Sequence, residues 1–156
     1  MIYKNFHEFQ QKVAKLPHRL LGLDVGNKTI GIAVSDSSCK IASPLKTLQR
    51  KGKHSEIKDI QGILKEYAAS SLIVGYPLHM NGDEGERCVY VRSFVEQLTK
   101  DLSIPVLLWD ERMSTVSAER FLLEGDMSRA KRKEHIDAVA ASVILQSFLD
   151  FLQHQL

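Results

Sequence analysis

Residues 19–36 read RLLGLDVGNKTIGIAVSD and contain two apolar runs joined by the short link Asn27-Lys28. A link of two residues between apolar runs predicts a β-hairpin. A third run, KIASPLKTL at residues 40–48, continues the pattern after another short link. We therefore expect three consecutive antiparallel strands over residues 19–48.

Beyond residue 50 the sequence alternates between helical periodicity and short apolar runs. Apolar side chains at helical spacing predict helices over about residues 57–67, 88–102, 114–123 and 134–152. The short apolar runs predict buried strands at residues 71–76 and 105–110. Strands separated by helices pair in parallel through right-handed crossovers. The predicted fold is therefore α/β, with one mixed five-stranded sheet (three antiparallel strands, then two parallel ones) flanked by helices.

A helical segment, residues 1–18, precedes this domain, which we place at residues 19–156. Asn5 and Glu8 resemble a helix start, and Pro17 ends the helix. The length of 156 residues suits one domain, and the composition, 44% hydrophobic and 26% charged, is typical of a globular protein.

The composition argues against several classes of protein. The net charge of +2 neither requires nor excludes a nucleic-acid partner, so the placement of the cations matters more. Cys39 and Cys88 form no disulfide framework, and the histidines lack the spacing of a zinc site. No secretory signal is visible, and the apolar stretch 138–145 is too short to cross a bilayer. We expect a soluble cytoplasmic protein without a membrane partner.

Asp24 is the first candidate functional residue. It interrupts an apolar strand, where an unpaired carboxylate is costly to bury. Gly22 and Gly26 flank it on the same face of the strand, so we expect a bare surface that a large ligand can approach. The alternative is a structural carboxylate that accepts hydrogen bonds from backbone amides.

Two further carboxylates stand out. Glu111 follows the apolar run PVLL, at the carboxyl end of a predicted parallel strand, where ligands gather. It could instead belong to a solvated turn paired with Arg112, and Asp110 could take its role if the strand ends one residue away. Asp137 lies within an apolar helix, where aspartate is unfavourable, although the positive end of the helix dipole could stabilise it.

Three such carboxylates fit one or two hard divalent cations, Mg²⁺ or Mn²⁺, since these ions prefer oxygen ligands. Two ions about 4 Å apart can activate water and stabilise the leaving oxygen of a phosphodiester. We therefore predict that Asp24, Glu111 and Asp137 are catalytic residues and metal ligands.

Cations cluster just before the helix that carries Asp137 and could hold a phosphate backbone. The candidate nucleic-acid-binding residues are Arg129, Lys131, Arg132 and Lys133, with Lys28 and Arg112 in addition. A charge run is also typical of an ordinary solvated surface. Aromatic residues do not interleave with these cations, so the sequence does not indicate base stacking.

Four stretches, in this order, resemble the YqgF (RuvX-like) family of Holliday junction resolvases and pre-16S rRNA nucleases: LLGLDVGNKTIGIAVSD, LIVGYPLHMNGDEGERC, VLLWDERMSTVSAER and KRKEHIDAVAASVILQSFL. The resemblance covers about residues 19–152. It implies a ribonuclease H-like fold and a cytoplasmic hydrolase that acts on nucleic acid, with ribosomal RNA maturation as the favoured role. The family's acidic residues fall on Asp24 of GLDVG, Glu111 of DERMST and Asp137 of HIDAVAA.

The function that we predict is a metal-dependent nuclease that processes the 5′ end of pre-16S rRNA. One alternative is a Holliday junction resolvase, which would need a symmetric dimer to cut two strands of branched DNA. Another is a non-catalytic module that binds RNA or the ribosome. A phosphotransferase of the actin or sugar-kinase type also uses D-x-G on a first hairpin, but it needs two such domains. The sequence leaves open whether the protein is a monomer or a homodimer.

Overall fold

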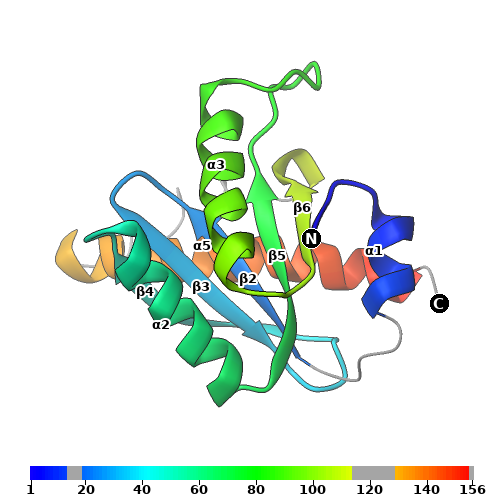
Figure 1. Ribbon diagram of the computed structural model, residues 1–156, viewed down its shortest axis with the longest axis horizontal. Helices are drawn as coiled ribbons and strands as arrows, with labels where there is room; N and C mark the ends of the chain where they lie inside the picture. The colour runs from blue at the N-terminus through cyan, green and yellow to red at the C-terminus, as the bar shows by residue number, and fades with distance from the viewer. Residues whose placement is uncertain (14–18, 114–128, 155–156) are drawn as a thin grey trace.

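The computed structural model describes residues 1–13, 19–113 and 129–154, apart from the side chains of residues 53, 54 and 129–135. It shows an α/β domain with a single mixed sheet flanked by helices (Figure 1). The strands are β1 Ile2–Tyr3, β2 Arg19–Val25, β3 Thr29–Ser35, β4 Ala42–Gln49, β5 Ala69–Tyr76 and β6 Val106–Asp110. The helices are α1 Phe6–Val13, α2 Lys53–Glu66, α3 Glu86–Asp101, the short 3₁₀ helix η1 Glu111–Met113, and α5 Arg129–His154.

The sheet has the strand order β1-β6-β5-β2-β3-β4. The antiparallel β2–β3–β4 unit and the parallel pairs β2–β5 and β5–β6 confirm the predicted topology. The predicted number of five strands was wrong by one, because β1 adds a sixth strand parallel to β6. Its two residues pair with Val106 and Leu107, and so short a strand has no periodicity that a sequence could reveal.

Helices cover both faces of the sheet, as expected. In Figure 1, α2 and α3 lie in front of the sheet and α5 crosses behind it. Leu21, Leu23 and Val25 face α2 and α3 in one core cluster, whereas Leu20 lies in the second cluster with α5. The predicted alternation of β2 side chains between the two faces of the sheet is therefore confirmed. By the same alternation, Asp24 is on the face that α5 covers.

Helix α5 lies unusually close to the sheet, because glycines of the strands leave room for it. A Cβ atom on Gly22 would come within 2.8 Å of the Leu145 Cβ atom. A Cβ atom on Gly31 would lie only 1.9 Å from the main-chain oxygen of Asp137. Helix and sheet therefore touch backbone to backbone at Gly31, which fixes the position of Asp137 along the sheet.

The helix predicted from residue 134 begins at Arg129 instead, so the basic stretch 129–133 is helical rather than a loop. Residues 129–133 are four cations and one alanine, so no apolar period in the sequence marks this part of the helix. The helix predicted over residues 114–123 lies outside the described residues.

The N-terminal helix is confirmed. The Asn5 side-chain oxygen accepts hydrogen bonds from the backbone N–H groups of His7 (2.8 Å) and Glu8 (3.4 Å), which caps α1. Phe9 is buried against Phe148 of α5, with ring centroids 5.9 Å apart. The segment therefore packs on the domain instead of projecting from it.

In the described part of the chain, residues 136–154 of α5 are long and apolar enough to cross a membrane by length and composition. The same stretch supplies Ala141, Ile144, Leu145 and Phe148 to the core cluster on this face of the sheet. Packing within the domain therefore explains part of its apolar character.

Candidate active site

Asp24 lies near the carboxyl end of the central strand β2, and it is only 6% exposed. Gly31 of β3 is its direct partner in the antiparallel pair. On the other side, Leu23 is paired with Val74, so that Gly75 of β5 follows beside Asp24. Residues opposite one another in neighbouring strands share a face, and the carboxylate therefore lies between two positions that have no side chain.

The cross-strand glycines do not leave an open surface around Asp24, because the backbone of Asp137 covers Gly31 and the Glu111 side chain covers Gly75. The prediction that Gly22 leaves open space was wrong, because Leu145 and Ala141 of α5 fill that position. Gly26 lies in the β2–β3 turn, where its N–H donates to the Thr29 carbonyl at 2.9 Å.

Glu111 is the first residue of η1, directly after β6. Its Oε1 atom is 2.6 Å from the point where a Cβ atom on Gly75 would lie. The carboxylate therefore occupies the space above Gly75, on the strand next to Asp24. A side chain at position 75 would displace it.

Asp110 is engaged elsewhere, which argues against an exchange of roles with Glu111. Its carboxylate forms a two-pronged ion pair with Arg112, with Oδ1 3.0 Å from Nε and Oδ2 2.7 Å from Nη2. The hydrogen bonds from this guanidinium lower the pKa of Asp110. Arg112 also donates to the Met80 carbonyl at 3.1 Å, so it joins the loop before α3 to the end of β6.

Asp137 lies about two turns into α5, since the helix begins at Arg129. The helix dipole acts mainly within the first turn, so it does not explain an aspartate at this position. The Asp137 Oδ2 atom accepts a 2.6 Å hydrogen bond from the Thr29 hydroxyl. Sequence analysis missed Thr29, because its partner is distant in the chain and no pattern links the two.

The structure thus brings the three acids to the same end of the sheet, around the end of β2. Asp137 lies over Gly31, Glu111 lies over Gly75, and Asp24 lies between these two glycines. Within the described residues, no three carboxylate, imidazole or thiolate groups are already close enough together to hold a metal ion. The chemistry of the donors nevertheless fits Mg²⁺ or Mn²⁺, which prefer carboxylate oxygens and retain several waters.

The predicted nucleic-acid contacts differ in their placement. Lys28 is exposed in the turn that follows β2, close in sequence to Asp24. Arg112 is held by Asp110 and Met80. The side chains of Arg129, Lys131, Arg132 and Lys133 lie outside the described residues, although their backbone forms the first turns of the helix that carries Asp137.

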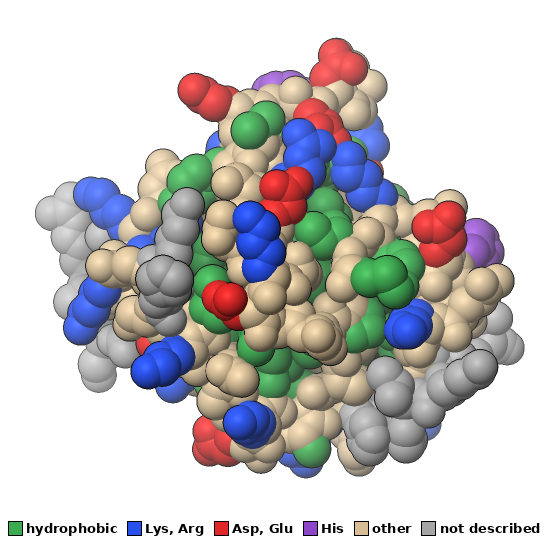
Figure 2. Space-filling model, viewed as in Figure 1, with side chains coloured by type: hydrophobic (Ala, Val, Ile, Leu, Met, Phe, Trp, Pro, Cys, Tyr) green, Lys and Arg blue, Asp and Glu red, His purple; other side chains and the backbone are tan. Residues whose placement is uncertain are grey.

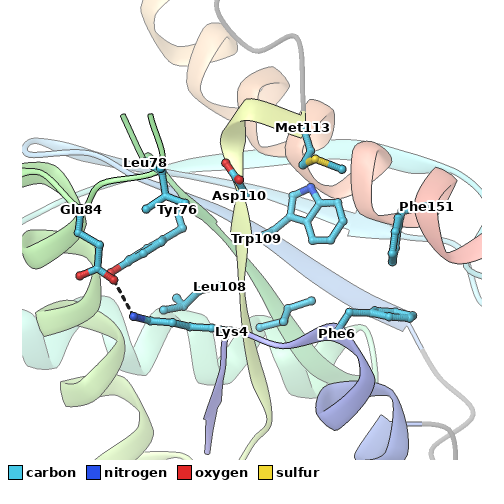
Figure 3. A pocket seen from close by; sticks show the side chains of 12 residues that line it. Lys4, Phe6, Tyr76, Leu78, Glu84, Leu108, Trp109, Asp110, Met113 and Phe151 are labelled. Carbon is cyan, nitrogen blue, oxygen red and sulfur yellow. Dashed lines mark hydrogen bonds and ion pairs between the residues drawn. The ribbon is translucent and has the colours of Figure 1, made fainter. Parts of the chain in front are cut away.

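A cavity of about 430 Å³ lies beside the outer edge of β6, where β1 no longer covers it (Figure 3). Its walls include Lys4 and Phe6 of the N-terminal segment together with Trp109, Asp110 and Phe151. None of the three candidate acids lines it. At its rim Lys4 forms a 2.6 Å ion pair with Glu84, and this contact is the main reason why the pKa of Glu84 falls to about 2.

The chain is similar to proteins of one family over most of its length. The family model described as "RuvX: Holliday junction resolvase" matches residues 18–151. A protein of Caldanaerobacter subterraneus subsp. tengcongensis, provisionally named a pre-16S rRNA nuclease, is 52% identical over 133 residues, which cover 85% of this chain and 96% of that one. A protein of Ruegeria sp. with the same provisional name is 44% identical over 156 residues, 99% of this chain and 98% of that one.

The fold is shared with a solved structure of much lower sequence identity. T. thermophilus RuvC in complex with a Holliday junction substrate matches with a TM-score of 0.54 at 14% identity, over 86% of this chain and 96% of that one. This likeness shows the fold alone, the ribonuclease H-like arrangement that the sequence predicted. The extent of the family match and the identity to its curated members establish that this chain belongs to the RuvX family.

Proposed function

We propose that this protein is a metal-dependent nuclease that hydrolyses phosphodiester bonds, and that its substrate is the 5′ end of pre-16S rRNA. The observation that carries the proposal is the grouping of Asp24, Glu111 and Asp137 around two glycine positions at the end of the central strand. The provisional names of the most similar relatives support the choice of substrate.

In the proposed site, Asp24, Glu111 and Asp137 would hold the cation with their carboxylate oxygens. When bound, the cation supplies Lewis acidity toward the phosphate and lowers the pKa of bound water. The chain's own contribution is to orient these ligands. Burial restricts Asp24, the Thr29 hydroxyl fixes one oxygen of Asp137, and the bare backbone at Gly75 gives Glu111 its place.

The negative charge of the three carboxylates would repel a nucleic acid, so a cation and nearby basic groups are both needed. Lys28 is exposed in the turn that follows β2, and the basic start of α5 lies on the helix of Asp137. Phosphate contacts of this kind position a strand without reading its sequence.

A second candidate is a resolvase of branched DNA. The description of the family model and the fold shared with RuvC favour it. A resolvase must cut two strands symmetrically and therefore requires a dimer, whereas cleavage of an RNA end does not.

The test compares cleavage of a pre-16S rRNA fragment and a four-way DNA junction, each with Mg²⁺, Mn²⁺ or EDTA. Asp24→Asn keeps the size of the side chain but weakens a metal ligand, so we expect at least a roughly 100-fold loss of cleavage. Asp59→Asn, an exposed aspartate on α2, is the matched control and should cleave like the wild type.

The outcomes separate the candidates. Cleavage of the RNA but not of the junction supports the proposal, and the reverse supports the resolvase. If the wild type and Asp24→Asn bind RNA equally and neither cleaves it, the catalytic proposal is wrong and the protein is a binding module.

A further inference from the structure

Tyr90 of α3 is an aromatic residue at the surface, 39% exposed, that rests on a largely buried cation. The Arg50 guanidinium lies over its ring, 5.1 Å from the centroid, and donates a hydrogen bond to its hydroxyl. Arg50 is itself fixed by an ion pair with the buried Glu56 (3.1 Å) and lies over the ring of Phe94 (4.9 Å). The tyrosine ring is therefore held in place and at the same time open to solvent.

The support beneath Tyr90 is fastened to the turn that follows Asp24. Arg50 donates through Nη1 to the Gly26 carbonyl and through its backbone N–H to the Lys28 carbonyl, both at 2.9 Å. Tyr90 belongs to α3, on the face of the sheet opposite to α5 and Asp24, so a strand bound on its ring would reach the candidate active site by passing around the end of β2.

Exposed cations surround the same place. Arg87 lies one helical turn before Tyr90, on the same side of α3, and donates to the Val25 carbonyl at 3.4 Å. Lys28 is exposed in the adjoining turn. Figure 2 shows several Lys and Arg side chains along its left side, where Figure 1 draws the β2–β3 hairpin and the beginning of α2.

We propose that Tyr90 is a stacking platform for one nucleobase of a single-stranded substrate, at the same end of the sheet as the candidate active site, with Arg87 and Lys28 contacting the flanking phosphates. This inference rests on the proposed nuclease function and adds a subsite to it. Proteins that bind single strands combine aromatic platforms with a cationic track, because every base has a π face. The folded chain provides this combination, although no aromatic residue lies among the cations at 129–133.

The alternative is that Tyr90 serves only as a cover for Arg50. Two substitutions distinguish the roles. Tyr90→Leu still covers the guanidinium with apolar surface but offers no ring for stacking. Tyr90→Phe keeps the ring and loses only the hydroxyl that accepts the hydrogen bond from Arg50.

The experiment measures binding of short single-stranded RNAs from the 5′ region of pre-16S rRNA, with 2-aminopurine placed at successive positions. The proteins carry Asp24→Asn so that the RNA stays intact, and thermal unfolding checks that each variant is folded. We expect Tyr90→Ala and Tyr90→Leu to weaken binding at least about fivefold and to abolish the fluorescence change at one position. Tyr90→Phe and the neighbouring surface change Val89→Ala should retain both.

The inference is overturned if folded Tyr90→Leu binds as tightly as its parent and gives the same fluorescence change. Failure of the nuclease proposal would look different. The wild-type protein would then cleave no RNA, while substitution of Tyr90 would still weaken RNA binding. If the wild-type protein cleaves RNA and Tyr90→Ala changes neither binding nor cleavage, the nuclease proposal is supported and the stacking subsite is refuted.

Discussion

Replacing Gly31 with alanine should damage the active site through a single methyl group. The added Cβ atom would lie 1.9 Å from the main-chain oxygen of Asp137 and 2.3 Å from its carbonyl carbon. Ordinary contacts begin at 3.4 Å, so the two must separate by about 1.5 Å. Both atoms belong to the backbone of α5, which cannot turn aside as the end of a flexible side chain could.

The displacement of α5 has two expected effects. Forcing an extra methyl group into a packed interface costs about 1–3 kcal/mol of folding free energy. Misplacing a catalytic group by about 1 Å can cost roughly 100-fold in rate. Gly31→Ala should therefore lose more activity than its loss of stability explains, because the carbonyl that moves is that of Asp137.

Cleavage of pre-16S rRNA with Mg²⁺ measures the loss of activity, and urea unfolding followed by circular dichroism measures the loss of stability. Gly62→Ala is the matched control, since a Cβ atom on Gly62 meets nothing within 4 Å. Gly62 lies within α2, where alanine should stabilise the helix by about 0.5–1 kcal/mol and leave cleavage unchanged. If Gly31→Ala is as stable and as active as the wild type, the close contact between α5 and β3 does not hold Asp137 in place.

Two further predictions concern ion pairs. Arg50→Met should lower the free energy of unfolding by about 3 kcal/mol, because it leaves the buried carboxylate of Glu56 unpaired. The double variant Arg50→Met/Glu56→Gln should regain part of the lost free energy of unfolding, measured by urea unfolding. A double variant as unstable as Arg50→Met would contradict this explanation. Glu84 has a pKa of about 2 in the folded state against an ordinary 4.5, so its pairing with Lys4 and Arg92 stabilises the protein above pH 4.5 and less as the pH falls toward 2. Glu84→Gln should unfold at a lower urea concentration than the wild type at pH 6. The urea midpoints of the two proteins should converge as the pH falls from 4.5 toward 2. A difference that does not depend on pH would show that the charge is not responsible.

Most of the fold could be predicted from the sequence, because long periodic segments carry a strong signal. The two parts that were missed, strand β1 and the first turns of α5, have no periodic signal in the sequence. Strand β1 exists only through its pairing with β6, about a hundred residues further along the chain. The first turns of α5 are rich in Lys and Arg, which favour helices but leave no apolar stripe to mark the start.

The candidate acids stood out in the sequence because a carboxylate within an apolar segment is conspicuous. Their surroundings could not be predicted, since these depend on strand register. Gly31 and Gly75 adjoin Asp24 only because β3 and β5 flank β2 in a particular register. The assignment of the three acids as metal ligands stays a prediction.

The close fit of α5 on β3 also has a consequence for the order in which the proposed site is assembled during synthesis of the chain. Thr29 and Asp137, which are joined by a hydrogen bond, are separated by 108 residues. At about 5–20 residues per second, the ribosome needs roughly 5–20 s to make the intervening chain. For that interval the β2–β3–β4 unit exists without the helix that covers it. Over that interval the proposed site lacks Asp137, so a nuclease that depends on these three acids would be inactive until α5 has been made and has docked on the sheet.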